Sequence, residues 1–382
     1  MPNGLLARRT IGYITEDTLA NIVGIEGSFN NYLAGKDGLK VQQRLTGGAW
    51  IDVDNLETVH ARPGDDIVTT IDLDLQDATE NALYKQLSKH KAHHGCAVVM
   101  EVKTGDIKAI ANLEMGSDGL YHETYNYAVG ESAEPGSTFK LMSMIVALED
   151  GVIDLHDTIN TGDGTVRYYD KVIRDHEDEG LGKVTAREVF EHSSNVGTAK
   201  IIYENYKDNP RRYVDRLYSM KINKPLDLQI KGEGKPVIRA PGDKLWSGIS
   251  LPMMSHGYEV QMTPLQILTF YNAVANGGKM VKPRFVTEVR DGNRVVKSFD
   301  TEVITNAICS RSTIRKAQSL LEGVVENGTA KNLKNSNYKI AGKTGTAQIA
   351  NAKHGYRSGS RISYHASFVG YFPADDPLYS CI

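Results

Sequence analysis

Ser137 and Lys140 have the types and the spacing of a nucleophile and its base. They follow Pro135-Gly136, which ends any preceding element, and they open a segment with apolar residues at helical spacing up to Gly151. Residues three apart lie on one face of a helix, so the two side chains can reach each other. The free N–H groups and the dipole of a helix N-terminus disfavour a protonated lysine. The pair therefore predicts a serine nucleophile with a lysine base.

Two later segments carry polar side chains that suit the same chemistry. They contribute Ser193, Asn195, Lys343, Thr344, Gly345 and Thr346. Each motif alone is weak, because Ser-x-x-Lys recurs at residues 88–91 and 336–339, and Lys-Thr-Gly recurs at 103–105. Only the set that begins at Ser137 combines a helix N-terminus, a loop between helices and a strand at a sheet edge.

The elements that must position these residues follow from hydrophobic spacing and end signals. Helices are predicted over residues 73–87 and 137–150, after the capping boxes at Thr185 and Thr263, and over 312–327. Strands are predicted over 67–71, in a hairpin of 95–101 and 107–111, and over 338–341 and 365–372. Residues 158–183 are polar and irregular. This order predicts a mixed α/β (α+β) fold in which helices flank a central sheet.

The composition narrows the functional class. The chain has 382 residues, a net charge of −3 and no basic run, so nothing indicates a nucleic-acid partner. Its three cysteines are too few and too scattered for a disulfide framework. The spacing of His and Cys predicts no metal site, and no cofactor is implied. Pro63-Gly64 is the predicted boundary between a small accessory module, residues 1–62, and a catalytic domain, residues 63–382.

The resemblance to a known family extends beyond these three motifs. Further segments follow in the family's order: Arg9-Thr10-Ile11-Gly12-Tyr13, Gly24-Ile25-Glu26-Gly27, Gly64-Asp65-Asp66, Thr70-Ile71-Asp72, Lys103-Thr104-Gly105-Asp106, Thr263-Pro264-Leu265-Gln266 and Ser367-Phe368-Val369-Gly370-Tyr371. Over essentially its whole length the chain resembles a class B penicillin-binding protein of the penicillin-binding and serine β-lactamase superfamily. The segment Ser193-Ser194-Asn195-Val196-Gly197 is closer to the division-type members than to the elongation-type ones.

This resemblance implies a fold, an activity and partners. The fold is a central antiparallel sheet flanked by helices, with residues 1–62 as the remnant of an N-terminal pedestal or dimerisation module. The activity is a serine D,D-transpeptidase that cross-links peptidoglycan stem peptides, a D-Ala-D-Ala donor and an amine acceptor, and that β-lactams acylate. The implied setting is septal wall synthesis on the outer side of the bacterial cytoplasmic membrane, with divisome membrane proteins as partners.

The resemblance also assigns roles residue by residue. Ser137 attacks the carbonyl between two D-alanines, and Lys140 takes its proton, kept neutral by the cationic Lys343 and by the helix end. Ser193 relays a proton to the leaving amine. The backbone N–H groups of Ser137 and Thr346 form an oxyanion hole.

The remaining motif residues bind substrate in this assignment. Asn195 holds the substrate amide, and the segment of Lys343, Thr344, Gly345 and Thr346 binds the terminal carboxylate. The family also has an N-terminal membrane helix and a last strand and helix on the sheet. We expect the chain to lack these parts, and its sheet to have an exposed edge where the last strand is missing.

Three other activities stay open at this point. A D,D-carboxypeptidase or a β-lactamase-type hydrolase would use the same residues, and some hydrolases add a Glu four residues before an Asn as a base for deacylation. That spacing occurs at Glu191/Asn195 and at Glu302/Asn306. A β-lactam sensor or an inactive divisome scaffold would keep the pocket for binding alone, but a scaffold would be expected to have lost one of the lysines.

Overall fold

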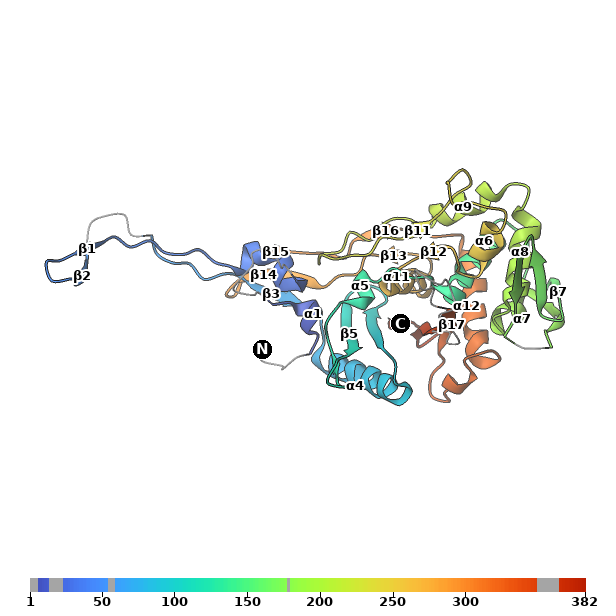
Figure 1. Cartoon of the computed structure of the whole chain (residues 1–382), viewed down its shortest axis with the longest axis horizontal. Coiled ribbons are helices and arrows are strands. Elements are labelled where there is room, and N and C mark those ends of the chain that lie inside the picture. The colour runs from blue at the N-terminus through green and yellow to red at the C-terminus, as the bar shows by residue number, and fades with distance from the viewer. Residues whose placement is uncertain (1–5, 14–22, 54–58, 177–178, 349–363) are drawn as a thin grey trace.

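The computed structural model describes residues 6–13, 23–53, 59–176, 179–348 and 364–382. A large body carries most of the helices, and a thin arm that contains β1 (Gln42–Arg44) and β2 (Trp50–Asp52) extends from one end of it (Figure 1). Among these residues, none of the helices combines the length and the apolar character that crossing a bilayer requires.

A six-stranded sheet forms the centre of the body. Its order is β17-β18-β19-β4-β5-β6, and all its neighbours are antiparallel. The strands are β4 (His94–Glu101), β5 (Ile107–Met115), β6 (Tyr121–His122), β17 (Ala341–Gln348), β18 (Tyr364–Phe372) and β19 (Tyr379–Cys381). The predicted hairpin is therefore confirmed as β4 and β5, and the antiparallel sheet with flanking helices is confirmed as well.

The last residues of the chain lie inside the sheet rather than at an exposed edge. β19 pairs with β18 on one side and with β4 on the other. Three residues are enough to join the two halves of the sheet into one hydrogen-bonded layer, because each strand neighbour needs only a short ladder. β17, which carries Lys343, lies at an outer edge of this sheet.

Helices cover the sheet and enclose the core. The longer ones are α4 (Leu73–His90), α6 (Lys140–Glu149), α8 (Asn195–Tyr206), α9 (Pro210–Ser219), α11 (Pro264–Ala275) and α12 (Arg311–Glu326). The shorter ones are α1 (Arg8–Ile11), α2 (Gly24–Ser28), α3 (Asn30–Leu33), α5 (Tyr127–Gly130), α7 (Ala186–Glu191), α10 (Ser250–Ser255), η1 (Gly136–Phe139) and η2 (Lys331–Leu333). α11 contacts β18, and α12 contacts both β17 and α6.

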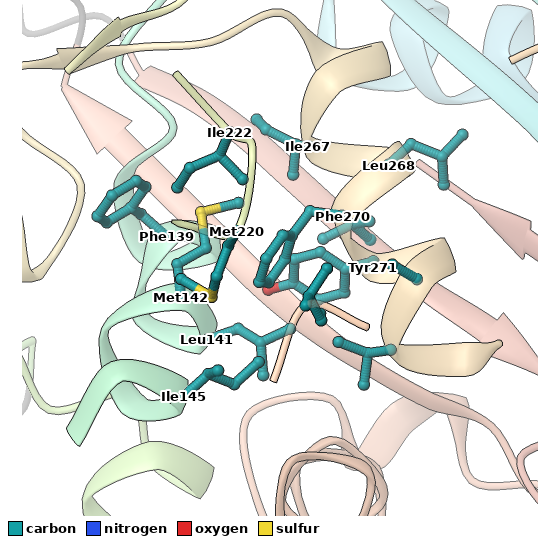
Figure 2. Packing of buried hydrophobic residues seen from close by; sticks show 14 of the residues in the cluster. Phe139, Leu141, Met142, Ile145, Met220, Ile222, Ile267, Leu268, Phe270 and Tyr271 are labelled. Carbon is teal, nitrogen blue, oxygen red and sulfur yellow. The ribbon is translucent and has the colours of Figure 1, made fainter. Parts of the chain in front are cut away.

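The helix α6 is buried from Lys140 to Leu148. Figure 2 shows Leu141 and Ile145 of α6 in the same apolar cluster as Phe270 and Tyr271 of α11. Each such side chain contributes about 1.5–3 kcal/mol when it is fully buried. This packing fixes α6 beside α11 in the core.

Both predicted capping boxes are present, at Thr185 before α7 and at Thr263 before α11. Two other sequence predictions need correction. β17 begins at Ala341, so the strand includes the Lys-Thr-Gly segment instead of ending before it. Four strands lie in the described part of the stretch that was expected to be irregular, because short hairpins with exposed polar faces lack a continuous apolar pattern. These strands are β7 (Thr158–Gly162), β8 (Thr165–Tyr168), β9 (Lys171–Arg174) and β10 (Gly182–Thr185).

The N-terminal segment joins the body through packing and through a second sheet. β3 (Asp66–Thr69) pairs with β14 (Val286–Asp291), which also pairs with β15 (Arg294–Ser298). Ile25 and Phe29 belong to the main apolar core. The other short strands are β11 (Val237–Ile238), β12 (Val260–Gln261), β13 (Met280–Val281) and β16 (Val303–Thr305). Part of the predicted accessory module thus shares the core of the catalytic body, and its boundary at Pro63 stays a prediction.

Candidate active site

Ser137 lies in a tight turn in front of α6. The structure places it in η1, a 3₁₀ turn, and the α-helix begins only at Lys140, which corrects the predicted α-helical turn. Gly136 has φ +55°, and a Cβ atom there would lie 2.8 Å from the Cβ atom of Ala347 in β17. Only glycine meets both demands without strain. The turn therefore packs directly on β17.

Two further contacts fix the turn against the sheet. A Cβ atom at Gly345 would lie 2.9 Å from Cγ2 of Thr138, so β17 and η1 approach each other at this point. The hydroxyl of Tyr271 in α11 donates a hydrogen bond of 2.8 Å to the carbonyl of Thr138. The Lys-Thr-Gly segment and the Ser137 turn are thus neighbours in space, although more than half of the chain separates them.

Ser193 occupies the loop between α7 and α8 with a left-handed backbone, φ +58°. This conformation is uncommon for a residue other than glycine and marks functional sites more often than ordinary loops. Ser194 follows as the N-cap of α8, because its hydroxyl accepts a hydrogen bond of 2.8 Å from the N–H of Gly197. The cap holds Asn195 at the first position of the helix.

The three motifs meet at the side chain of Ser193. Lys140 Nζ donates to Ser193 O at 2.5 Å, to Ser193 Oγ at 3.1 Å and to Asn195 Oδ1 at 2.7 Å. Lys343 Nζ donates to the same Ser193 Oγ at 2.8 Å and to its neighbour's carbonyl, Thr344 O, at 3.0 Å. The hydroxyl of Ser137 makes no hydrogen bond with another residue that the structure describes. In this structure Lys140 is therefore hydrogen-bonded to Ser193 and Asn195 and not to Ser137.

Burial sets the charge of the two lysines. Both side chains are fully buried. Burial lowers the pKa of Lys140 to about 7, against the opposing charge of Asp175. Burial and, second, the charge of Lys140 hold the pKa of Lys343 well below its usual range. From the sequence we expect Lys343 and the helix end to lower the pKa of Lys140, but in the structure burial is the main cause.

Two of the predicted substrate-binding residues, Asn195 and Thr346, border a cleft of about 520 Å³. Its lining includes Asn195, His256 and Thr346, together with part of β9. Thr346 is exposed to solvent, whereas the hydroxyl of Thr344 is 2.6 Å from the hydroxyl of Thr329. Asn195 also donates from Nδ2 to Arg174 O at 2.8 Å, which fixes the orientation of its amide. The cleft thus opens beside the network of lysines.

Two residues of this site were missed in the sequence. Asp175 accepts hydrogen bonds from the hydroxyl of Ser194 at 2.8 Å and from the N–H of Val196 at 2.9 Å, so it supports the start of α8. His256 is buried beside the cleft, and burial lowers its pKa to about 3, so its imidazole is neutral. Neither lies in a recognisable motif, and only the fold brings them here.

Glu191 and Glu302, each of which precedes an Asn by four residues as in some hydrolases, lie away from the network of lysines. Glu191 is buried, and a Cβ atom at Gly323 of α12 would lie 2.0 Å from its Oε1, so the carboxylate faces α12. It also pairs with Arg187 at 3.5 Å. Glu302 is largely exposed and pairs with Lys282 at 3.2 Å. Within the described residues, neither carboxylate contacts the network around Ser193.

The sequence is similar to those of known proteins. A family model described as the penicillin binding protein transpeptidase domain matches residues 95–382. Penicillin-binding protein PbpB of Mycobacterium tuberculosis is 29% identical over 99% of this chain and 56% of its own length. Peptidoglycan D,D-transpeptidase FtsI of Escherichia coli is 26% identical over 100% of this chain and 61% of its own. The chain thus spans little more than half the length of these relatives.

The likeness extends to three dimensions. The apo-form crystal structure of penicillin binding protein 3 from Mycobacterium tuberculosis has a TM-score of 0.81 and 26% sequence identity, covering 100% of this chain and 82% of that one. Another structure of that protein, with a TM-score of 0.80 and 27% identity, is complexed with ampicillin; it covers 100% of this chain and 81% of that one.

Proposed function

This chain belongs to the penicillin-binding protein transpeptidase family, and from that premise we propose that it is a peptidoglycan D,D-transpeptidase that works through a serine acyl-enzyme. The observation that carries the proposal is the convergence of Lys140 and Lys343 on Ser193, next to the turn that holds Ser137. This arrangement joins a nucleophile, a base of suitable pKa and a proton relay in one place.

Acylation begins when the hydroxyl of Ser137 attacks the carbonyl carbon between the two D-alanines of the donor. Its proton passes to neutral Lys140 Nζ as the C–O bond forms. The backbone N–H groups of Ser137 and Thr346 stabilise the oxyanion of the tetrahedral intermediate. The pKa of about 7 supports this role for Lys140, because the amine is then a base for a large part of the molecules at neutral pH.

The leaving group needs a proton at its nitrogen when the C–N bond breaks. Ser193 Oγ lies 3.1 Å from Lys140 Nζ and 2.8 Å from Lys343 Nζ, so it can give its proton to the departing D-alanine and recover one from Lys140. The second half reverses these steps. The acceptor amine attacks the ester carbon and loses its proton, and Ser137 regains its hydroxyl hydrogen.

Binding of the donor carboxylate would set the charges of the lysines. An anion beside Lys343 favours its protonated form and offsets the penalty of burial. Protonated Lys343 in turn disfavours a proton on Lys140. Thr346, exposed at the cleft, and Thr344 are the hydroxyls beside Lys343 that would bind the same carboxylate, and the small Gly345 between them lets β17 approach the Ser137 turn. Asn195 would hold the substrate amide.

We favour transfer to an amine over hydrolysis, because the carboxylates near the site are already engaged in other contacts. Glu191 faces α12, and Asp175 already accepts two hydrogen bonds at the start of α8. Neither is placed as a free base that activates water, so a penicillin bound to Ser137 should stay there. A neighbouring stem-peptide amine is then the acceptor. The segment of residues 193–197 resembles the division-type members, which favours septal synthesis outside the cytoplasmic membrane with divisome membrane proteins as partners.

The experiment is intact mass spectrometry of the chain after addition of a penicillin, followed by a D-Ala-D-Ala donor with a D-amino acid as acceptor. We expect one penicillin per chain on Ser137, stable for minutes, and transfer of the donor acyl group to the acceptor amine. Ser137→Ala should abolish the adduct. Ser88→Ala, at the Ser-x-x-Lys of α4, is the matched control and should keep it.

Other outcomes would replace the proposal. Loss of the penicillin adduct within seconds would make the protein a β-lactam hydrolase. Release of D-alanine with only water as acceptor, even in excess amine, would make it a carboxypeptidase. If the penicillin adduct is stable but no D-Ala-D-Ala donor reacts, the protein is a β-lactam sensor or an inactive scaffold.

A further inference from the structure

Two histidines and a glutamate lie together outside the network of lysines. His94 begins β4, Glu131 follows α5, and His365 is the second residue of β18. One ligand atom from each lies within 4.8 Å of the other two. His94 Nε2 and Glu131 Oε2 are 3.2 Å apart, and their side chains are 19% and 29% exposed.

The surroundings orient the ring of His94. Its face stacks on Tyr127, with ring centroids 4.1 Å apart and planes inclined by 17°. Its other nitrogen, Nδ1, lies 3.0 Å from Nδ1 of His93. A hydrogen bond at that nitrogen leaves Nε2 to face the carboxylate. Histidines that bind metals are oriented in the same way, through a partner on the second ring nitrogen.

The geometry fits a small divalent transition metal. Zn²⁺ takes imidazole nitrogens and carboxylate oxygens at about 2.0 Å in a tetrahedron, which places neighbouring ligand atoms about 3.3 Å apart. His94 Nε2 and Glu131 Oε2 are joined by a hydrogen bond of 3.2 Å, so a metal that displaced the bridging proton would find these two atoms near the required spacing. Mg²⁺ and Ca²⁺ prefer sets of oxygen ligands, so the two imidazoles select against them.

We propose that His94, Glu131 and His365 bind one Zn²⁺ ion, with water in the fourth position. This site is separate from the proposed transpeptidase chemistry and does not depend on it. Spacing in the sequence could not reveal it, because His94 and Glu131 are 37 residues apart and His365 lies near the other end of the chain.

The ion would join three segments that surround the Ser137 turn. His365 is paired with Ala347 of β17, the residue against which Gly136 packs. Glu131 lies on the stretch of chain that leads into this turn, two residues before the bridge of Ala133 with Met262. Binding at the three ligands would therefore hold β18 and this stretch against β4, and we expect the bound form to resist unfolding more strongly.

The test is titration of the tag-free, metal-stripped chain with ZnCl₂ by calorimetry and by native mass spectrometry. We expect one Zn²⁺ per chain in the wild type, and none with MgCl₂. Glu131→Gln and His365→Gln should each weaken binding at least about tenfold, and His93→Ala, which removes only the orienting partner, should weaken it about tenfold as well. His122→Gln is the matched control, because His122 pairs at 2.8 Å with the single carboxylate of Asp118.

The proposal is overturned if the wild type binds no Zn²⁺, or if it binds with an affinity that Glu131→Gln and His365→Gln leave unchanged. The same variants are checked for folding by circular dichroism and by penicillin acylation. Because Zn²⁺ binding is measured without any substrate, it can fail while the transpeptidase proposal stands, and the reverse also holds.

Discussion

The two polar clusters of this protein differ in burial, and that difference separates their chemistry. In the lysine cluster, Lys140 and Lys343 are fully buried around Ser193, and burial lowers the pKa of both amines. In the histidine cluster, His94 and Glu131 stay partly exposed and share a hydrogen bond of 3.2 Å. A buried amine that has lost its proton is a base, whereas partly exposed imidazole and carboxylate groups that converge can act as ligands.

The largest expected effect tests the lysine cluster. Lys140→Ala should slow acylation of Ser137 by a penicillin about 10²- to 10⁴-fold, because proton removal by a positioned base contributes that much. Initial binding should change far less. Stopped-flow kinetics at several penicillin concentrations separate the two constants. Equal losses in both constants would remove Lys140 from the role of base.

The second-largest effect on acylation is expected at Lys343. Lys343→Ala removes a charged partner of the substrate carboxylate, and hydrogen bonds to charged groups are worth about 1.5–3 kcal/mol, so the second-order acylation constant should fall about 10- to 100-fold. Lys339→Ala is the matched control, because Lys339 is exposed and lies 3.8 Å from Glu322. With a β-lactam whose carboxylate is esterified, the wild type and the Lys343→Ala variant should have the same second-order acylation constant. If the variant is equally impaired with the ester, Lys343 does not act through the carboxylate.

A smaller effect is expected at Asp175. Its charge raises the pKa of Lys140, so Asp175→Asn should lower that pKa further. A base with a lower pKa stays neutral at lower pH, and the acylation profile should therefore shift toward acid. The amide oxygen can still accept the hydrogen bond from the N–H of Val196, and the amide nitrogen can donate to the hydroxyl of Ser194, which limits damage to α8. A shift toward alkali would contradict the stated electrostatics.

The smallest effect belongs to the histidine cluster. A ligand at 100 times its dissociation constant stabilises the folded state by about 2.7 kcal/mol, which corresponds to a few degrees in Tm for a chain of this size. Zn²⁺ should raise the Tm of the wild type and of His122→Gln, but not of His365→Gln. Equal increases in all three would place the ion elsewhere.

The two clusters also show what sequence can predict. The lysine cluster was found because each member sits in a short motif whose local context, a turn before a helix or a loop between helices, is visible in the pattern. The sheet, the capped helices at Thr185 and Thr263 and the order of elements were predictable for the same local reason. Packing on β17 was not, since it depends on contacts such as that of Gly136 with Ala347.

The features that the sequence did not predict depend on burial and on pairing between distant segments. The main cause of the lowered pKa of Lys140 is its depth in the fold, which no local pattern reports. The short strands β7 to β10 have polar faces, so they produced no clear apolar signal. His94, Glu131 and His365 come together only through the sheet and the chain before Ser137.

The pH dependence of acylation tests the central claim, that neutral Lys140 activates Ser137. Only the neutral amine accepts a proton, so the acylation rate should rise with pH and reach half its maximum near pH 7, the pKa of Lys140. Glu123 needs a control, because burial raises its pKa to about 7 as well. Glu123→Gln should keep the midpoint. A rate that is constant from pH 5.5 to 8.5, or a midpoint that disappears in Glu123→Gln, would contradict the account.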